Sequence, residues 1–303
     1  MKTIIGAGLA GLVAAHAWPR ATILEASPQP TVNHRALLRF RTDAVARLTG
    51  IEFRQVRVHK GIVIDGEFVP PSIRAANLYA RKVLGHVKGD RSIWNLAPVD
   101  RFVAPDTLYE QLVVAASDRI HWGVQSDFTF SKSRGSVVST APLPVTLRAV
   151  GIEHEVTFRR AGIRVLRWTV PGVELFQTIY FPGDETPVYR ASFTGNTLIA
   201  ELVGNTIADA SEVLNDLGEA FGVDITAAES LGEVKQTYGK IEPISDAARK
   251  DFLFRLTHEH GIYSLGRFAT WRNILLDDVV DDISVIKRLS HADSRYALKI
   301  ATQ

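Results

Sequence analysis

Two glycine-containing segments near opposite ends of the chain carry residues whose types and spacing suggest chemistry. The first is IIGAGLAGLVAA, residues 4–15, in which Gly6, Gly8 and Gly11 form a G-x-G-x-x-G pattern. The first glycine allows a tight turn, the second lets the backbone approach a pyrophosphate, and the third lets a helix pack on a strand. The start of that helix offers unpaired N–H groups and a partial positive charge to phosphates. The segment therefore predicts a dinucleotide site.

The elements around these glycines support the prediction. Residues 2–5 are expected to form a strand, residues 12–18 a helix, and residues 21–24 a second strand. Glu25 closes that strand, where a carboxylate can accept hydrogen bonds from an adenosine ribose. An acid there disfavours NADP, whose extra phosphate it would repel. The alternative is a glycine-rich turn in an unrelated α/β protein.

The second segment, SLGRFATWRN at residues 264–273, favours FAD over NAD. A strand-like stretch ends in Gly266-Arg267, and the acid-rich start of a helix follows after Leu275. A strand end beside a helix N-terminus again suits a phosphate or a ring. An extended cofactor would be held by segments from both ends of the chain. FAD needs such a second binding segment more often than NAD does. We expect non-covalent FAD, since the chain has no cysteine to tether it.

In these segments the chain resembles the flavin-binding superfamily of amine oxidases, protoporphyrinogen oxidases and UDP-galactopyranose mutases. VVSTAP at residues 137–142 matches the strand ending in Thr-x-Pro with which such chains re-enter the flavin domain, and GRFATWRN followed by LDDVVDD looks most like the mutases. The resemblance implies that Thr140 lies at the cofactor and that Gly266 and Arg267 lie at the pyrophosphate and ribityl chain. It places Thr270 and Trp271 near the isoalloxazine.

The chain departs from that superfamily in two respects. The second glycine-rich motif of amine oxidases is missing, and TVNHRALLRFRTD stands in its place. The chain is also shorter than typical members, which makes it similar to compact, phage-type flavoproteins. The resemblance therefore leaves the substrate open.

The expected fold is α/β, with a Rossmann-like FAD-binding domain and an inserted mixed α/β substrate domain. The FAD-binding domain is assigned to residues 1–50, 104–145 and 256–303, and the substrate domain to residues 51–103 and 146–255. Short apolar stretches separated by Pro-Gly and Gly-Asn turns predict an antiparallel sheet between residues 154 and 201. Helices are expected over residues 29–48, 72–86, 107–117 and 208–221, and a hairpin over residues 51–69.

Several residues are candidates for catalysis or substrate binding. Lys240 could hold a water near the flavin or stabilise reduced flavin; the alternative is a surface lysine at a strand end. Trp271 and Tyr180 could line the reaction pocket, although aromatic residues of this kind are more often part of a core. Arg39 and Arg41 could neutralise a flavin phosphate or a substrate carboxylate or phosphate, and simple solvation is the alternative.

Two further groups of residues have side chains that could bind a ligand. Tyr189 and Arg190, in PVYRASF, could supply part of a grip on a diphosphate. His258 and His260 would share one face of a strand, but no third ligand at zinc spacing follows. No metal site is expected.

The composition limits the class of protein. Hydrophobic residues make up 46% and charged residues 22% of the 303 residues, as in an ordinary globular protein. No apolar run is long enough to span a membrane, and the expected location is the cytoplasm, or the host cytoplasm for a viral protein. The net charge of +2 is not typical of nucleic-acid binding. The basic stretch at residues 34–47 nevertheless makes DNA a candidate partner.

The leading hypothesis is an FAD-dependent oxidoreductase or oxidative lyase that acts beside nitrogen on an amine or an amino-acid-derived substrate. An amino-acid-modified thymine in phage DNA is one such substrate. The first alternative is a redox-neutral enzyme like UDP-galactopyranose mutase, acting on a sugar nucleotide. The second is a non-catalytic flavoprotein. The sequence does not predict the oligomeric state.

Overall fold

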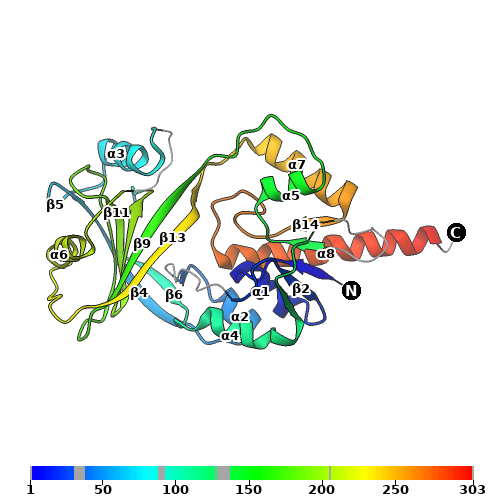
Figure 1. Ribbon diagram of the computed structural model, residues 1–303, viewed down its shortest axis with the longest axis horizontal. Helices are drawn as coiled ribbons and strands as arrows, with labels where there is room; N and C mark the ends of the chain where they lie inside the picture. Colours follow the sequence, from blue (N-terminus) through cyan, green and yellow to red (C-terminus); the bar gives the residue numbers. More distant parts are fainter. Residues whose placement is uncertain are drawn as a thin grey trace.

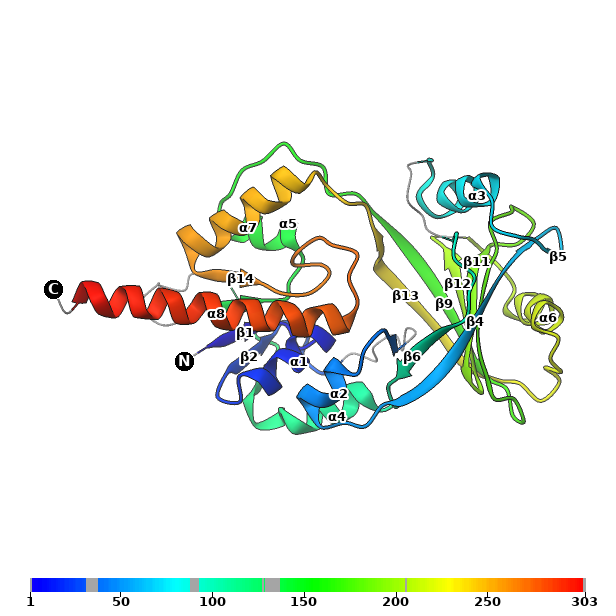
Figure 2. The same ribbon diagram turned by 180° about the vertical axis from the view of Figure 1, so that it is seen from behind.

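The computed structural model describes residues 2–30, 38–87, 93–126, 128, 137–204 and 206–301, with side chains up to residue 291. Figures 1 and 2 show two halves side by side, one built on a five-stranded sheet and the other on a nine-stranded sheet. Both ends of the chain lie in the half with the smaller sheet. No helix in the described part of the chain is long and apolar enough to cross a membrane.

The smaller sheet is entirely parallel, in the order β14-β8-β1-β2-β7. Its strands are β1 (Thr3–Ile5), β2 (Thr22–Glu25), β7 (Ile120–Trp122), β8 (Val137–Ser139) and β14 (Ile262–Ser264). Because the strands are parallel, their carboxyl ends meet at one edge of the sheet. The glycine-rich turn (residues 6–11), Glu25, Thr140 and the C-terminal turn (residues 265–271) therefore all begin at that edge.

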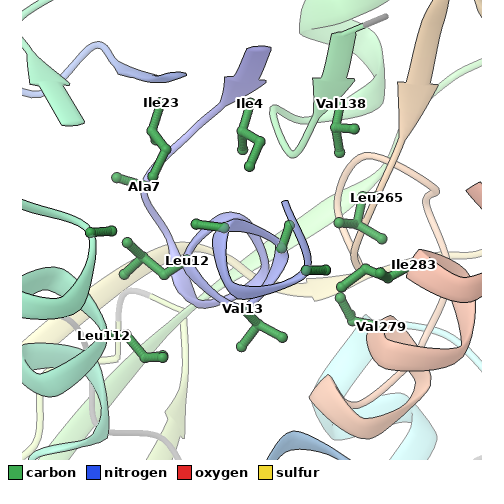
Figure 3. Close-up of a cluster of buried hydrophobic side chains, with 14 of the residues drawn as sticks. Ile4, Ala7, Leu12, Val13, Ile23, Leu112, Val138, Leu265, Val279 and Ile283 are labelled. Atoms are coloured by element: carbon green, nitrogen blue, oxygen red, sulfur yellow. The ribbon is translucent and has the colours of Figure 1, made fainter. Parts of the chain in front are cut away.

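Helices cover both faces of this sheet. The helices of this half are α1 (Leu9–Ala17), α2 (Ala44–Thr49), α4 (Leu108–Ala115), α5 (Leu143–Ala149), α7 (Asp246–His260) and α8 (Leu276–Ala301); a short 3-10 turn covers Ser117–Arg119. Figure 3 shows α1 between the strands and its neighbours α4 and α8, with Leu12 and Val13 among apolar side chains. Ile4 belongs to this cluster, whereas Ile5 belongs to the cluster beneath α5 and α7, as expected for successive strand residues.

The larger sheet has the order β13-β9-β12-β11-β10-β4-β6-β3, with β5 paired to β4. Its strands are β3 (Arg39–Phe40), β4 (Arg54–Ile64), β5 (Glu67–Phe68), β6 (Val99–Val103), β9 (Arg160–Thr169), β10 (Leu175–Tyr180), β11 (Val188–Gly195), β12 (Thr197–Val203) and β13 (Glu229–Ile241). Strands β9 to β12 pair antiparallel as predicted, whereas β10 runs parallel to β4. The sheet is therefore mixed.

Each face of the larger sheet is partly covered by one helix. Helix α6 (Ala210–Phe221) packs through Val213 and Leu217 on one face, and α3 (Ile73–Leu84) packs through Tyr79 and Val83 on the other. Both helices carry a side-chain N-cap, Asp209 in α6 and Ser72 in α3, and this satisfies N–H groups of their first turns.

The structure agrees with most of the expected elements and corrects two. A basic helix over residues 29–48 is wrong: residues 31–37 lie outside the described residues, Arg39–Phe40 is strand β3, and only Ala44–Thr49 is helical. The strand expected at residues 258–260 is the last turn of α7. His258 and His260 therefore lie on different sides of a helix and do not share a face. The division of the chain into two domains stays a prediction.

Candidate functional site

The glycine-rich turn is packed so closely that two of its glycines admit no side chain. Gly6 has φ +97°, and a Cβ built on it would lie 2.3 Å from Oγ1 of Thr140. A Cβ on Gly11 would lie 1.9 Å from the carbonyl oxygen of Gly6. Thr140 in turn donates its hydroxyl to the Ile5 carbonyl at 2.8 Å. These glycines are thus required by the packing of β1, α1 and β8.

Gly8 differs from both of these glycines. A Cβ on Gly8 would have no atom within 4 Å, and its φ of −73° is open to any residue. Packing therefore does not explain a glycine here. Gly8 is also the N-cap of α1, where no side chain caps the helix and no acid occupies the first turn. The first N–H groups of α1 thus have no side-chain cap at Gly8, which suits an anion.

Glu25 lies beside this turn at the end of β2. One carboxylate oxygen accepts from the Ala7 backbone N–H at 2.7 Å, and the other accepts from the Ser27 N–H at 2.8 Å. The two bonds orient the carboxylate along the edge of the sheet. Each oxygen keeps further lone-pair capacity, so the group can also accept from the hydroxyls of a ribose.

The C-terminal turn contacts the N-terminal helix. Gly266 has φ +89°, and a Cβ on it would lie 2.9 Å from the Cβ of Ala10, in the first turn of α1. The Leu265 N–H donates to the Ser139 carbonyl at 2.8 Å, which joins the turn to β8. Thr270 is buried and donates its hydroxyl to the Gly266 carbonyl at 2.8 Å. The two segments singled out in the sequence therefore meet at one place.

Arg267 connects the C-terminal turn to the larger sheet. Its guanidinium donates to the Gly239 carbonyl at 3.5 Å and to Oδ1 of Asn273 at 3.3 Å. Gly239 lies in β13, one residue before Lys240. Arg267 thus links the C-terminal turn, which follows the parallel sheet, to strand β13 of the larger sheet.

Trp271 is a core residue. Its side chain is 1% exposed, its indole N–H donates to the Glu242 carbonyl at 2.7 Å, and its ring packs edge-on against Phe158. Its backbone has φ +50°, which non-glycine residues rarely adopt. These contacts attach the C-terminal turn to the cluster beneath α5 and α7. The expectation that Trp271 also approaches the isoalloxazine stays a prediction.

A surface groove of about 740 Å³ runs beside Trp271. It is lined by residues of α5, the segment 151–158, β9 and β13, including Arg148, His154, Arg160 and Tyr238. None of its lining residues belongs to the glycine-rich turn or to β10, β11 or β12. Of the residues predicted to bind the cofactor or the substrate, Trp271 alone lines this groove.

One face of the larger sheet gathers most of the other candidates; we call it the polar face. Strand register places Tyr180 opposite Arg190, and Arg190 opposite Glu201, so the three side chains lie on the same side. Arg190 and Glu201 form a hydrogen-bonded ion pair. Burial acts to raise the pKa of Glu201, but the charges of Arg190 and Lys240 outweigh it and keep that pKa below its ordinary value.

Lys240 and Tyr189 extend the polar face. Lys240 is 8% exposed, and its ammonium lies 4.6 Å from the centre of the Tyr189 ring. The expectation of a surface lysine is therefore wrong for this residue. Tyr189 is fully buried, and burial raises the pKa of its phenol well above the ordinary value. Tyr180 packs edge-on against Tyr79 of α3.

The two candidate arginines of the 34–47 stretch differ in their surroundings. Arg39 is buried on the polar face, where it donates to Oγ1 of Thr178 at 2.8 Å. Arg41 is about half exposed and pairs with Asp278 and Asp277, at the start of α8. Acidic partners thus already neutralise Arg41, whereas Arg39 forms no ion pair within the described part of the chain.

Sequence reasoning missed several residues of the polar face, among them Glu201, Thr178 and Ser192. Glu201 lies in TLIAELV, and an acid inside an otherwise apolar strand is a sequence signal for a buried, partnered carboxylate. Thr178 and Ser192 are small polar residues with no motif around them. Their proximity to Arg39 follows from strand pairing across more than a hundred residues.

Comparisons with known proteins support the fold. No protein-family model and no curated protein matches the sequence. Among solved structures, reduced UDP-galactopyranose mutase is 14% identical with a TM-score of 0.62, and the match covers 100% of this chain and 94% of that chain. The α/β, Rossmann-type fold predicted from the sequence is thereby confirmed.

Two further solved structures share the fold. A geranylgeranyl bacteriochlorophyll reductase-like protein from Thermoplasma acidophilum is 12% identical with a TM-score of 0.52, over 97% of this chain and 79% of that chain. Aklavinone-11 hydroxylase, solved with FAD and aklavinone, is 11% identical with a TM-score of 0.50, over 88% of this chain and 56% of that chain.

Proposed function

We propose that the chain is an FAD-dependent enzyme whose cofactor lies along the carboxyl edge of the parallel sheet. The observation that carries this proposal is the open space over Gly8 at the uncapped N-terminus of α1, with the Glu25 carboxylate bonded to the backbone of the same turn. A pyrophosphate placed there would meet the N–H groups of α1 without steric hindrance. Glu25 would accept from the adenosine ribose, as the motif predicts.

FAD fits this edge better than NAD. The contact between Gly266 and Ala10 brings a second strand end to the same turn, and Arg267 extends from there to β13. Residues from both ends of the chain would thus line the path of an extended ligand. The solved neighbours, one of them containing FAD, have the same fold and support this choice.

We propose that the reaction is an oxidation, or an oxidative cleavage, beside nitrogen in an amine or an amino-acid-derived substrate. Bound FAD supplies the acceptor for a hydride or electron pair. The chain contributes the polar face, on which Lys240 lies near Glu201 and Tyr189. Lys240 would position a water or substrate group, and Tyr180 would line the pocket beside it.

A redox-neutral reaction on a sugar nucleotide is the second candidate, because the mutase resembles this chain over nearly the whole length of both. One contact argues against this second candidate. The guanidinium of Arg190, predicted to grip a diphosphate with Tyr189, is bonded to Glu201, and Tyr189 is fully buried. The substrate grip of a mutase would therefore require other residues.

The experiment that tests the proposal is anaerobic titration of the purified, FAD-loaded protein with candidate substrates. The panel contains primary and secondary amines, amino acids, amino-acid-modified thymine nucleosides and oligonucleotides, and sugar nucleotides. Bleaching of the flavin by an amine or amino-acid compound supports oxidation beside nitrogen. Turnover of a sugar nucleotide only after prior reduction would identify the mutase-like alternative. FAD binding with neither response would indicate a non-catalytic flavoprotein.

A further inference from the structure

Arg39 is a buried cation with no ion-pair partner among the residues that the structure describes. Its side chain is 8% exposed, and one terminal nitrogen donates to Thr178 while the other, NH1, has no hydrogen-bond partner. No carboxylate of the described residues forms an ion pair with it. Burial, and secondarily the charge of Arg190, lowers the pKa of Arg39 to about 10. Desolvation of an unpaired guanidinium is strongly unfavourable, so such a group usually has a compensating anion.

The two hydroxyls beside Arg39 provide another unused donor. Thr178 Oγ1 and Ser192 Oγ lie 2.9 Å apart, and both residues are buried. The pair has two hydroxyl protons, and their mutual hydrogen bond uses one of them, whichever residue donates. Arg39 can only donate, so it does not accept the other. The site therefore holds a guanidinium N–H and a hydroxyl proton, both suited to an acceptor-only group.

We infer that Arg39, with the Thr178–Ser192 pair, binds an oxyanion of the substrate, a carboxylate or a phosphate monoester. The inference rests on the proposed function and adds the chemical class of the substrate: it carries a single anionic group. A diphosphate fits less well, because Arg190, the neighbouring guanidinium, already neutralises Glu201. An amino acid or its derivative supplies such a group beside the nitrogen.

The position of Arg39 indicates that its ligand is the substrate and not the cofactor. Its side chain reaches strands β10 and β11, in the middle of the larger sheet, through Thr178 and Ser192. The glycine-rich turn belongs to the other sheet. The backbone next to Arg39 does connect the two, since the Arg41 N–H donates to Asp277 at the start of α8 at 2.9 Å. The anion would thus lie on the polar face of the larger sheet and not in the glycine-rich turn.

The test compares anion-induced stabilisation in the full chain and in Arg39→Met, each with and without FAD. Arg57→Gln is the matched control, because Arg57 is an exposed arginine of the same sheet, paired with Asp100. Melting temperatures are measured in sodium acetate, sodium phosphate or sodium chloride of equal ionic strength, at tens of millimolar. Comparing variants removes the general effect of each salt.

We expect acetate or phosphate to raise the Tm of the wild type and of Arg57→Gln by about 2 °C relative to chloride. The Tm of Arg39→Met should not differ between the anions. A response to acetate indicates a carboxylate substrate, and a response to phosphate alone indicates a phosphate monoester. The Tm of Arg39→Met in chloride should be equal to or above that of the wild type, because the variant removes an uncompensated buried charge.

Three results would overturn the inference. The first is the absence of an anion effect in the FAD-loaded wild type, and the second is an equal effect in Arg39→Met. The third is loss of FAD from Arg39→Met, which would assign Arg39 to the cofactor. If Arg39→Met does not fold, Arg39→Gln replaces it under the same criteria. If the wild-type protein takes up no FAD, that result contradicts the proposed function and not the inference about Arg39. The melting temperatures measured without FAD in acetate, phosphate and chloride then still test whether Arg39 binds an anion.

Discussion

The backbone of Gly266 lies against Ala10, so closely that a Cβ on Gly266 would stand 2.9 Å from the Cβ of Ala10. This contact joins the start of α1 to the C-terminal turn. It explains why a glycine stands at residue 266, where the φ of +89° is also unfavourable for other residues. The two segments predicted to bind one ligand thus form one surface.

Gly266→Ala should destabilise the protein and weaken FAD binding, because the new methyl group strains the backbone and pushes the C-terminal turn away from α1. We expect a loss of about 1–3 kcal/mol in the free energy of unfolding, from the backbone strain alone. Gly222→Ala is the control: Gly222 has φ +65° but nothing within 4 Å of its Cβ. Chemical denaturation and FAD titration are measured on both variants. Equal FAD affinity in both would contradict a role for the contact in binding.

Trp271 should act mainly on stability. Trp271→Ala removes a fully buried indole and is expected to cost about 3–5 kcal/mol of unfolding free energy. Trp271→Phe keeps most of the ring but leaves the Glu242 carbonyl without the indole N–H, at a cost of about 1–3 kcal/mol. The measurement is denaturant unfolding together with the flavin spectrum. A changed spectrum or reduction rate in Trp271→Phe, with stability intact, would instead place this ring at the isoalloxazine.

The parallel half of the fold could be predicted because its signals are local. Glycines at fixed spacing, an acid after the second strand and a Gly-Arg pair after the last one lie within short segments. The helix ending in His258-Glu259-His260, where we predicted a strand, has local signals as well. Ser245 caps its N-terminus and Gly261 ends it in a left-handed conformation.

The polar face could not be predicted in the same way. The basic and apolar residues around Arg39 predict a helix, but β3 pairs with β6, where Arg39 lies opposite Val103, far along the chain. The sequence suggests Arg190 as part of a diphosphate grip, whereas its partner in the structure, Glu201, lies eleven residues away on the next strand. Such partners depend on strand register, which a single sequence does not reveal.

The ion pair between Arg190 and Glu201 should be important for stability. Glu201→Gln leaves the partly buried guanidinium without its carboxylate, which is expected to cost about 3 kcal/mol. Because the pKa of Glu201 is lowered in the folded protein, the pair stabilises it above the ordinary carboxyl pKa of 4.5. That stabilisation is lost as the pH falls through the lower, folded-state pKa. Unfolding of wild type and variant is compared between neutral and acidic pH.

The double variant Arg190→Met/Glu201→Leu serves as the control for this pair. Replacing both charges with apolar groups of similar size should recover most of the stability lost in Glu201→Gln. If Glu201→Gln is as stable as the wild type at neutral pH, Arg190 does not depend on Glu201. It would then be available to a diphosphate, which would favour the mutase-like alternative.

Glu25→Ala should reduce FAD occupancy for two reasons. The variant removes an acceptor for the ribose, and it also removes the acceptors of the Ala7 and Ser27 N–H groups that order the turn. Each hydrogen bond to a charged group contributes on the order of 1.5–3 kcal/mol. FAD retention is measured after serial dilution and compared with that of the wild type. Retention equal to the wild type would show that Glu25 does not contact the ribose.

FAD content of the wild type and of Gly8→Ala is the most direct test of the central claim. Gly8 has an ordinary φ and no atom within 4 Å of its Cβ, whereas a Cβ on Gly11 would strike the Gly6 carbonyl. Gly8→Ala should therefore keep the melting temperature of the FAD-free protein, but its methyl group would occupy the approach of the pyrophosphate. We predict wild-type protein with about one FAD per chain and Gly8→Ala with at least tenfold weaker binding at an unchanged Tm. A wild type that takes up no FAD, or a Gly8→Ala variant that binds it equally well, would contradict the account.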